Sequence, residues 1–226
     1  MKKEKKDIDS LIVKFPKLYR ILNEYYGLDS IAKYSIEELI LDRIGNSENY
    51  KVYWKDGVLK NIGSEIGCNV QGITFGFIPN YGGQVQFSNE IDSNRKDITQ
   101  IQFYVSLLDN VYTIQILEIE ESKEFNPMMK LTLPKQTLKE IWVSPENHRH
   151  KDLFLKIQSS LEAITENPIF LPYSIQEIEL KGVKPPIMED KVIYTVGDAF
   201  FRKILPLHRN EALIKGNPDY EINKIT

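Results

Sequence analysis

Apolar residues near the start of the chain recur at spacings of three and four positions, which places them on one face of a helix. Pro16 suits the first position of such a helix, and Gly27 suits the position after its last turn. We therefore predict a helical turn before Phe15 and a longer helix from Pro16 to about Gly27. The apolar stripe consists of Leu11, Phe15, Leu18, Leu22 and Tyr25.

A second helix is predicted to begin at a capping box, Ser35–Glu38. The Ser35 hydroxyl can accept a hydrogen bond from the Glu38 amide, and the Glu38 carboxylate can reach back to the Ser35 amide. Gly45 is predicted to end this helix. Its apolar stripe consists of Ile36, Leu39, Ile40 and Ile44.

From about Tyr50 the spacing of apolar positions changes to two, which is typical of strands. The clearest hairpin is predicted around Asp109-Asn110 in a two-residue turn. One face would then be apolar and the other mostly polar, and a slip by one residue would turn the apolar set outward. The expected opposing pairs are Leu107 with Tyr112, Val105 with Ile114 and Phe103 with Ile116 on the apolar face, and Ser106 with Thr113 and Tyr104 with Gln115 on the other.

Further strands are predicted on both sides of this hairpin. A five-residue loop over 79–83 would place Phe77 opposite Val85 and Phe75 opposite Phe87. A third hairpin is predicted around Asp56-Gly57, between a strand with Val52 and Trp54 and one over 58–62. Met129–Leu133 is predicted to add another strand.

A long helix near 145–165 is predicted to cover the sheet, with Ser144 as its N-cap and Pro168 beyond its end. Residues 182–190 are predicted to form a loop, 192–196 a strand, and Asp198 the cap of a short helix. Because strands and helices are segregated, the fold class is α+β, an antiparallel meander of about five to seven strands. We predict a single domain over 1–226, with flexible ends at 1–6 and 216–226 and a turn at Gly216-Asn217-Pro218-Asp219.

The composition supports a folded core and disfavours some classes of binding partner. The 226 residues are 42% hydrophobic, and 29 basic against 32 acidic residues leave a net charge of −3. Disorder is therefore excluded as the main state, and a basic nucleic-acid binder is disfavoured. We predict a protein partner, no nucleic acid and no cofactor.

The compartment is inferred from cysteine use and the N-terminus. Cys68 is the single cysteine, so no intrachain disulfide and no cysteine-based zinc site can form. The basic N-terminus is not followed by the apolar run of a signal peptide, and no 18-residue apolar stretch occurs, so no membrane partner is predicted. We predict a cytoplasmic protein, and the bias of 23 Lys to six Arg and 29 Ile to four Ala suggests a bacterial source.

The densest polar cluster lies between residues 146 and 152. With Ser144 as N-cap, His148 and His150 would point to opposite sides of the helix, because two residues subtend about 200°. His148 and Asp152 could share one ion, although two ligands make a weak site. This cluster carries one hypothesis, a metal-assisted hydrolase that uses Glu146, His148, Asp152 and His208. The alternative is a solvated first turn of the helix, which we favour, and we predict no metal site.

Other catalytic signatures are missing from the sequence. It contains no Gly-x-Ser-x-Gly elbow and no His-Glu-x-x-His motif. Gly72–Gly76 lies in a predicted strand with no helix behind it, so a phosphate cradle is not expected. Glu118, Glu120 and Glu121 are expected to form a solvated strand edge.

Aromatic residues suggest binding. Tyr81 is predicted at an exposed loop tip beside Asn80, and Tyr104 on the polar face of the sheet. Exposed tyrosines favour protein interfaces. The leading hypothesis is a non-catalytic protein-binding module, either an adaptor, a chaperone-like protein or an inhibitor of the immunity type. Alternatives are the hydrolase above and a structural component of a larger assembly.

Overall fold

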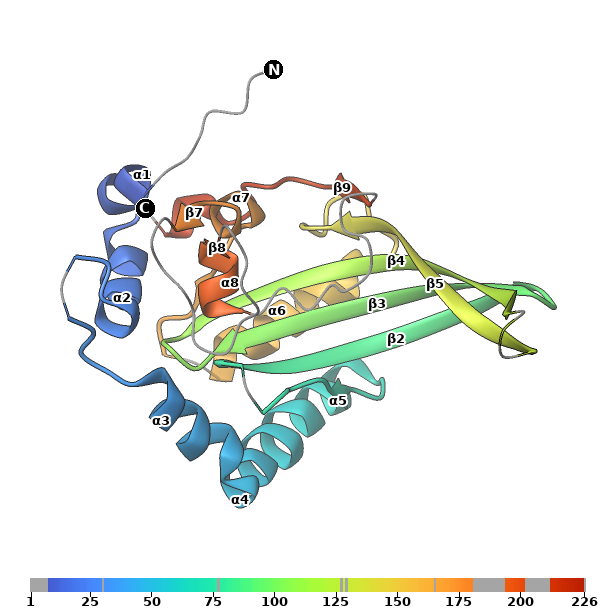
Figure 1. Cartoon of the computed structure of the whole chain (residues 1–226), viewed down its shortest axis with the longest axis horizontal. Coiled ribbons are helices and arrows are strands. Elements are labelled where there is room, and N and C mark those ends of the chain that lie inside the picture. Colours follow the sequence, from blue (N-terminus) through green and yellow to red (C-terminus); the bar gives the residue numbers. More distant parts are fainter. Residues whose placement is uncertain are drawn as a thin grey trace.

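A single large sheet organises the fold. The computed structural model describes residues 8–29, 31–76, 78–126, 128, 130–164, 166–180, 194–201 and 212–225. Among these residues, seven strands form a mostly antiparallel sheet in the order β1-β2-β3-β4-β5-β9, with β6 beside β4. The α+β class and the expected strand number are confirmed. Figure 1 shows four long strands, β2 to β5, extending along most of the molecule.

Helices flank the strands in sequence and in space. The large sheet contains β1 (Gln71–Gly72), β2 (Asn80–Asp92), β3 (Arg95–Ser106), β4 (Val111–Asn126), β5 (Leu131–Trp142), β6 (Ile169–Phe170) and β9 (Leu213–Lys215), and β7 (Glu179–Leu180) pairs separately with β8 (Tyr194–Thr195). The helices are α1 (Ile8–Lys14), α2 (Pro16–Tyr26), α3 (Ile36–Ile40), α4 (Ser47–Asn49), α5 (Lys60–Ile66), α6 (Lys151–Ile164), α7 (Tyr173–Gln176) and α8 (Val196–Phe200), with π-helical segments η1 (Leu41–Gly45) and η2 (Tyr50–Leu59) and a 3₁₀ turn η4 (Ile222–Lys224).

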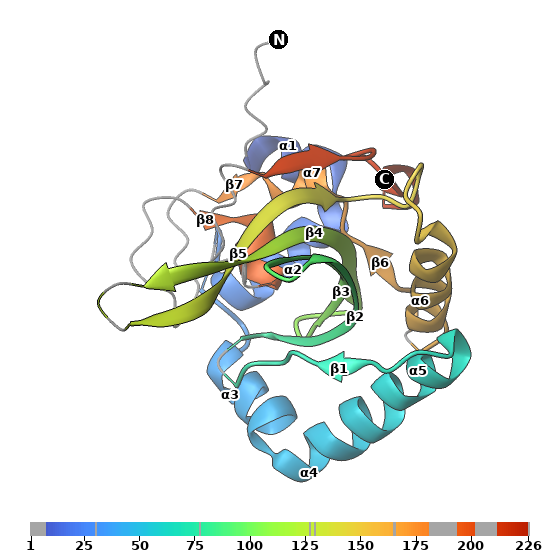
Figure 2. The same ribbon diagram turned by 90° about the vertical axis from the view of Figure 1, so that its right-hand side faces the viewer.

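The first face of the sheet is covered by η2, α5 and α6. Trp54 and Ile62 from the first two helices and Phe154 from α6 pack on Phe103 and Ile114. Figure 2 shows α5 and α6 next to each other beside the curved sheet. The expected role of the long helix as a cover is confirmed, although it begins at Lys151 rather than near 145.

The second face of the sheet is less exposed to solvent than expected. At one end, α1, α2, α3 and α8 bury Tyr104 and Val111. In the middle, the polar character is confirmed, because Gln102 accepts from Tyr104 and Gln115 and donates to Gln84 and Gln100. The face therefore combines an apolar end with a network of amide side chains.

The two N-terminal helix predictions are confirmed. Gly27 has a left-handed backbone with φ of 63° and closes α2. Ser35 accepts a hydrogen bond from the Glu38 amide at 3.2 Å, which is one of the two bonds of the predicted capping box. Both helices contribute to the core on the second face of the sheet.

The hairpin at residues 109 and 110 keeps the predicted faces but not the predicted register. Phe103 pairs with Ile114 and Val105 with Tyr112, so the connection has four residues, 107–110. Contacts outside the hairpin hold these residues: the Leu107 amide donates to the Pro79 carbonyl at 2.8 Å, and the Asn110 side chain donates to the Glu166 carbonyl. The observed register differs from the predicted one by two residues, which keeps each side chain on its predicted face because side chains alternate with a period of two.

The predicted loop over 79–83 is wrong. Residues 80–83 begin β2, and β1 is only Gln71–Gly72, which pairs with Gly83 and Gln84. Gly83 is needed in the strand because a Cβ there would lie 2.3 Å from the Phe103 ring. The predicted pairing of Phe75 with Phe87 is therefore wrong, and Phe77 lies outside the described residues.

The predicted hairpin at Asp56-Gly57 is also wrong, because residues 50–66 are helical. Trp54, Val58 and Ile62 are buried at spacings of four, which is the helical period. This burial against the sheet overrides the turn preference of Asp-Gly.

Residues near the C-terminus contact the sheet and its covering helix. β9 pairs in parallel with β5, and the Tyr220 ring packs edge-on against Phe154 and Phe170. The flexible end predicted at 216–226 stays a prediction, although Tyr220 within it packs against the core. A short helix is present, but the predicted cap is wrong: Thr195 is the N-cap of α8, and Asp198 lies in its first turn and completes the capping box. The end over 1–6, the loop over 182–190, Met129 and residues 192–193 lie outside the described residues.

Candidate functional site

A β-bulge interrupts the pairing of β4 and β5 beside Glu118. Glu118 pairs with Glu140 and Ile119 with Leu138, which leaves Lys139 as an extra residue. Bulges bend a strand and change the direction of its side chains, and they are frequent beside functional sites. The bulge lies where the covering helices end and the sheet becomes exposed.

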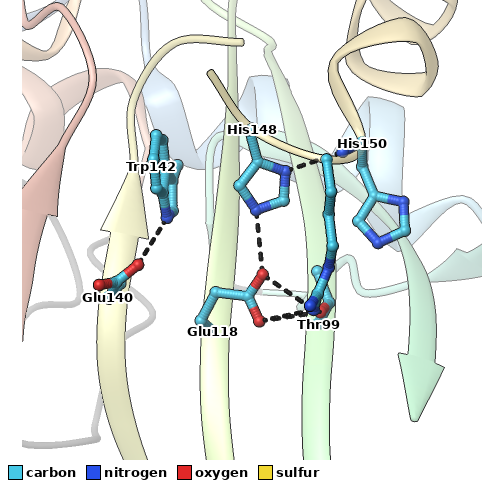
Figure 3. Close-up of polar contacts among 7 residues, drawn as sticks. Thr99, Glu118, Glu140, Trp142, His148 and His150 are labelled. Atoms are coloured by element: carbon cyan, nitrogen blue, oxygen red, sulfur yellow. Dashed lines mark hydrogen bonds and ion pairs between the residues drawn. The ribbon is translucent and has the colours of Figure 1, made fainter. Parts of the chain in front are cut away.

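The Glu118 carboxylate is the centre of a polar cluster on β3, β4 and the turn before α6 (Figure 3). Its Oε1 accepts from His148 Nε2 at 3.0 Å, and its Oε2 accepts from the Thr99 hydroxyl at 2.9 Å. Arg149 Nη2 lies 3.1 Å from Oε2 and also donates to the Thr99 hydroxyl. Glu118 therefore ties two strands to the segment that leads into α6.

His148 lies in a turn rather than in the helix. Its amide donates to the Pro145 carbonyl at 3.2 Å, and its own carbonyl accepts from the Lys151 amide at 3.1 Å. The predicted N-cap Ser144 instead accepts from the Asn217 amide at 2.8 Å. The expected opposite orientation of the histidines is therefore wrong, and the rings of His148 and His150 lie 5.6 Å apart.

Both nitrogens of the His148 ring are occupied. Nδ1 accepts from the His150 amide at 3.0 Å, so the proton of the neutral ring lies on Nε2 and is donated to Glu118. The residue is only 8% exposed. To bind a metal or accept a substrate proton, His148 would first have to give up one of these hydrogen bonds.

Aromatic rings flank the two histidines. Trp142 packs edge-on against His148 at a centroid distance of 5.0 Å, and its Nε1 donates to Glu140 at 2.8 Å. His150 stacks on Phe87 of β2 at 4.7 Å. Beside this cluster lies an open pocket of about 410 Å³, lined by Asp97, Glu118, Ile119, Lys139, Glu140, Trp142, Asn147, His148 and Arg149.

The environment favours a charged Glu118 and a neutral His150. Partial burial opposes ionisation of Glu118, but the hydrogen bonds from His148 and Thr99 and the charge of Arg149 together hold its pKa below the ordinary value. Burial, and then the nearby Arg149, lower the pKa of His150. The cluster is an ion-paired junction between strands and turn.

The residues proposed for a hydrolase do not converge. His148 contacts Glu118, whereas Glu146 lies near Tyr220 and Asp152 is exposed in the first turn of α6. His208 lies outside the described residues. In the part of the chain that is described, no group of three or more His, Cys, Asp or Glu side chains could hold a metal ion.

The residues proposed for binding are buried. Tyr81 is 5% exposed and stacks on Trp54 at 4.9 Å, so the expected loop tip is wrong. Asn80 and Tyr104 are 1% and 4% exposed. These side chains belong to the core because β2 begins at Asn80 and the N-terminal helices cover Tyr104.

The prediction that Glu118 lies on a solvated strand edge is wrong, because β4 lies between β3 and β5, and its sequence context held a signal for a different role. Glu118 follows Ile114 and Ile116 at spacings of two and so lies on the apolar face. A carboxylate in such a row indicates a partner that compensates its burial. Neither Thr99 nor Arg149 could be assigned as that partner, because both come from distant parts of the chain.

Beyond this cluster the four long strands continue as an arm, which we define as residues 86–92, 95–97, 120–126 and 131–137. Figure 1 shows this end of the sheet projecting past the helices. Four large apolar side chains on the arm are exposed: Ile91 at 48%, Phe125 at 61%, Leu131 at 54% and Leu133 at 36%.

Comparisons with protein-family models, curated proteins and solved structures give no match. Within the described residues, no helix has both the length and the apolar character needed to cross a membrane. The function is therefore argued from the geometry of this chain.

Proposed function

We propose that this protein is a non-catalytic protein-binding module whose partner contacts the arm. The observation that carries the proposal is the exposure of Ile91, Phe125, Leu131 and Leu133 on strands that extend beyond their covering helices. Isolated exposed apolar residues are common on protein surfaces, but four on one projecting element, with Leu131 and Leu133 on one face of the sheet and Phe125 on the other, favour an interaction site.

Ion pairs support a rigid arm. Lys96 contacts Glu121 at 2.8 Å, and Lys135 contacts Glu124 at 2.9 Å, in both cases across neighbouring strands. Cross-strand pairs stabilise a sheet modestly and compensate charge. An arm of this kind offers a partner apolar contacts at a small cost in conformational entropy.

The occupied ring of His148 supports a binding role over catalysis. The cluster around Glu118 holds the base of the arm in place and leaves neither nitrogen of the His148 ring for proton transfer. Within the proposal, the adaptor, chaperone-like and immunity-type roles are the candidate classes, and the setting is the bacterial cytoplasm. Mild acidity and the single cysteine agree with this setting.

The test is site-specific crosslinking in a native lysate. A photoreactive residue at Leu133 should give a crosslinked partner, whereas the same residue at Val13, which is 78% exposed on α1, should not. The Leu131→Ser, Leu133→Ser double variant should reduce capture by roughly tenfold, because apolar contact area is lost. An unchanged melting temperature would show that the fold is kept. Full capture by the double variant would overturn the proposal.

A further inference from the structure

The outer edge of β2 carries unpaired backbone groups beyond β1. The Gly82 carbonyl accepts from the Ile73 amide at 2.9 Å, and the Gly82 amide donates to the Thr74 hydroxyl at 2.9 Å. The backbone of Gly82 therefore points away from β3. Because direction alternates along a strand, Gln86, Ser88 and Glu90 point the same way.

These three residues have no strand beside them among the described residues. The pairing of β1 with β2 stops at Gln84, and the irregularity in the pairing with β3 begins after Glu90. The side chains of Gln86, Ser88 and Glu90 are all exposed. Three amides and three carbonyls thus form an open edge, which is a template for another strand.

We propose that this edge pairs with the same edge of a second copy of the chain, antiparallel and with Ser88 on the twofold axis. Ser88 then faces its own counterpart, and Gln86 faces Glu90 of the other copy. All three pairs join residues whose backbones point outward, so six hydrogen bonds form. The two large sheets become one continuous sheet.

Charge and existing pairing disfavour twofold axes at the two adjacent outward-pointing residues, Glu90 and Gln86. In the Ser88 register no acidic residue opposes another, because Glu90 meets an amide and Phe87 meets Asn89. A twofold axis at Glu90 would oppose two carboxylates, which is destabilising. An axis at Gln86 would place Ser88 opposite Gln84, whose outer side is already paired with Gln71.

The second copy is favoured over an unrelated peptide because a twofold contact satisfies both exposed edges at once. The other edge of the sheet is less suitable. β5 contains Pro134, which lacks an amide hydrogen, and β9 already pairs with Glu140–Trp142. The inference does not depend on the proposed partner of the arm, because its test uses purified protein alone.

The experiment is sedimentation equilibrium of the purified full chain over a range of concentrations. The expected mass rises to twice the chain mass of 26.3 kDa. Ser88→Pro should weaken the dimer roughly tenfold or more, because the two central hydrogen bonds lose their donors. The outward amide of Ser88 makes no ladder bond to β3, so this variant should still fold.

A charge-swap pair separates loss of the contact from loss of the fold. Ser88→Lys and Ser88→Glu should each associate more weakly than the original chain, and their equimolar mixture should restore the dimer, because opposite charges then meet on the axis. In hydrogen exchange, the amides of Gln86, Ser88 and Glu90 should become protected as concentration rises. A single-chain mass at the highest soluble concentration, or a dimer in which these amides gain no protection, would overturn the proposal.

Discussion

At the scale of single residues, Glu118 has the most consequential environment on the exposed half of the sheet. A carboxylate on the apolar side of a strand needs donors, and three side chains supply them: Thr99, His148 and Arg149. The result is a charged group that contributes to folding only while it remains ionised.

The lowered pKa of Glu118 gives a pH dependence with a definite sign. The carboxyl binds a proton more readily in the unfolded chain, so its stabilisation is present above the ordinary value of 4.5 and is lost as pH falls through the lower folded value. Glu118→Gln should lower the free energy of unfolding at neutral pH by about 1–3 kcal/mol and flatten its decline in acid.

Urea unfolding of the original chain and of Glu118→Gln across this acid range measures the difference. Glu124→Gln is the matched control, because Glu124 is exposed and pairs with Lys135 at the surface. Equal acid sensitivity of the original chain and Glu118→Gln would show that the Glu118 cluster does not stabilise the fold.

At the scale of elements, the segment over 50–66 shows how packing decides between helix and hairpin. Trp54 lies beneath Tyr81, and its Nε1 donates to the Gly82 carbonyl at 3.1 Å. The helix is therefore anchored on the strand that replaces the predicted loop.

Trp54→Ala should destabilise the protein by about 3–5 kcal/mol, as expected for a buried aromatic residue that leaves a cavity. Val52→Ala, on the exposed side of the same segment, should change stability by less than about 0.5 kcal/mol. Thermal or urea unfolding of both variants provides the comparison. Similar losses for the two would contradict the helical packing.

Local signals in the sequence were sufficient for some elements. The N-cap at Ser35 and the glycine after α2 act within a few residues, so both could be recognised. The faces of β3 and β4 also followed from alternation. Their register did not, because the contacts of Leu107 and Asn110 come from residues far along the chain.

The loop predicted over Asn80 to Gly83 is wrong for a related reason. Small and polar residues of this kind are typical of turns. Here Gly83 is required by the close approach of Phe103 and Leu59, which belong to other elements. The polar cluster around Glu118 could not be predicted either, since the bulge at Lys139 and the donors to Glu118 depend on tertiary pairing.

At the scale of the whole molecule, the described residues offer a junction and an arm rather than a metal centre. His148 and Glu118 use each other as partners, and Glu146 and Asp152 lie elsewhere. The hydrolase hypothesis remains a prediction with a direct thermal test.

Millimolar zinc or manganese should leave the melting temperature within error, because a stabilising ion requires a site that binds it more tightly in the folded chain. Differential scanning fluorimetry with and without EDTA measures this. A rise that disappears in His148→Ala, but persists in a surface control such as Glu124→Gln, would instead support a metal site at the junction.

The two borders of the sheet differ in a way that bears on aggregation. Proline in β5 and the pairing with β9 restrict one border, while the border at Ser88 is free to join its own copy. Such a contact pairs the same border of both molecules, so that border is no longer open to a third chain. Association of this kind stops at two chains, so a protein with an open edge strand can avoid forming fibrils.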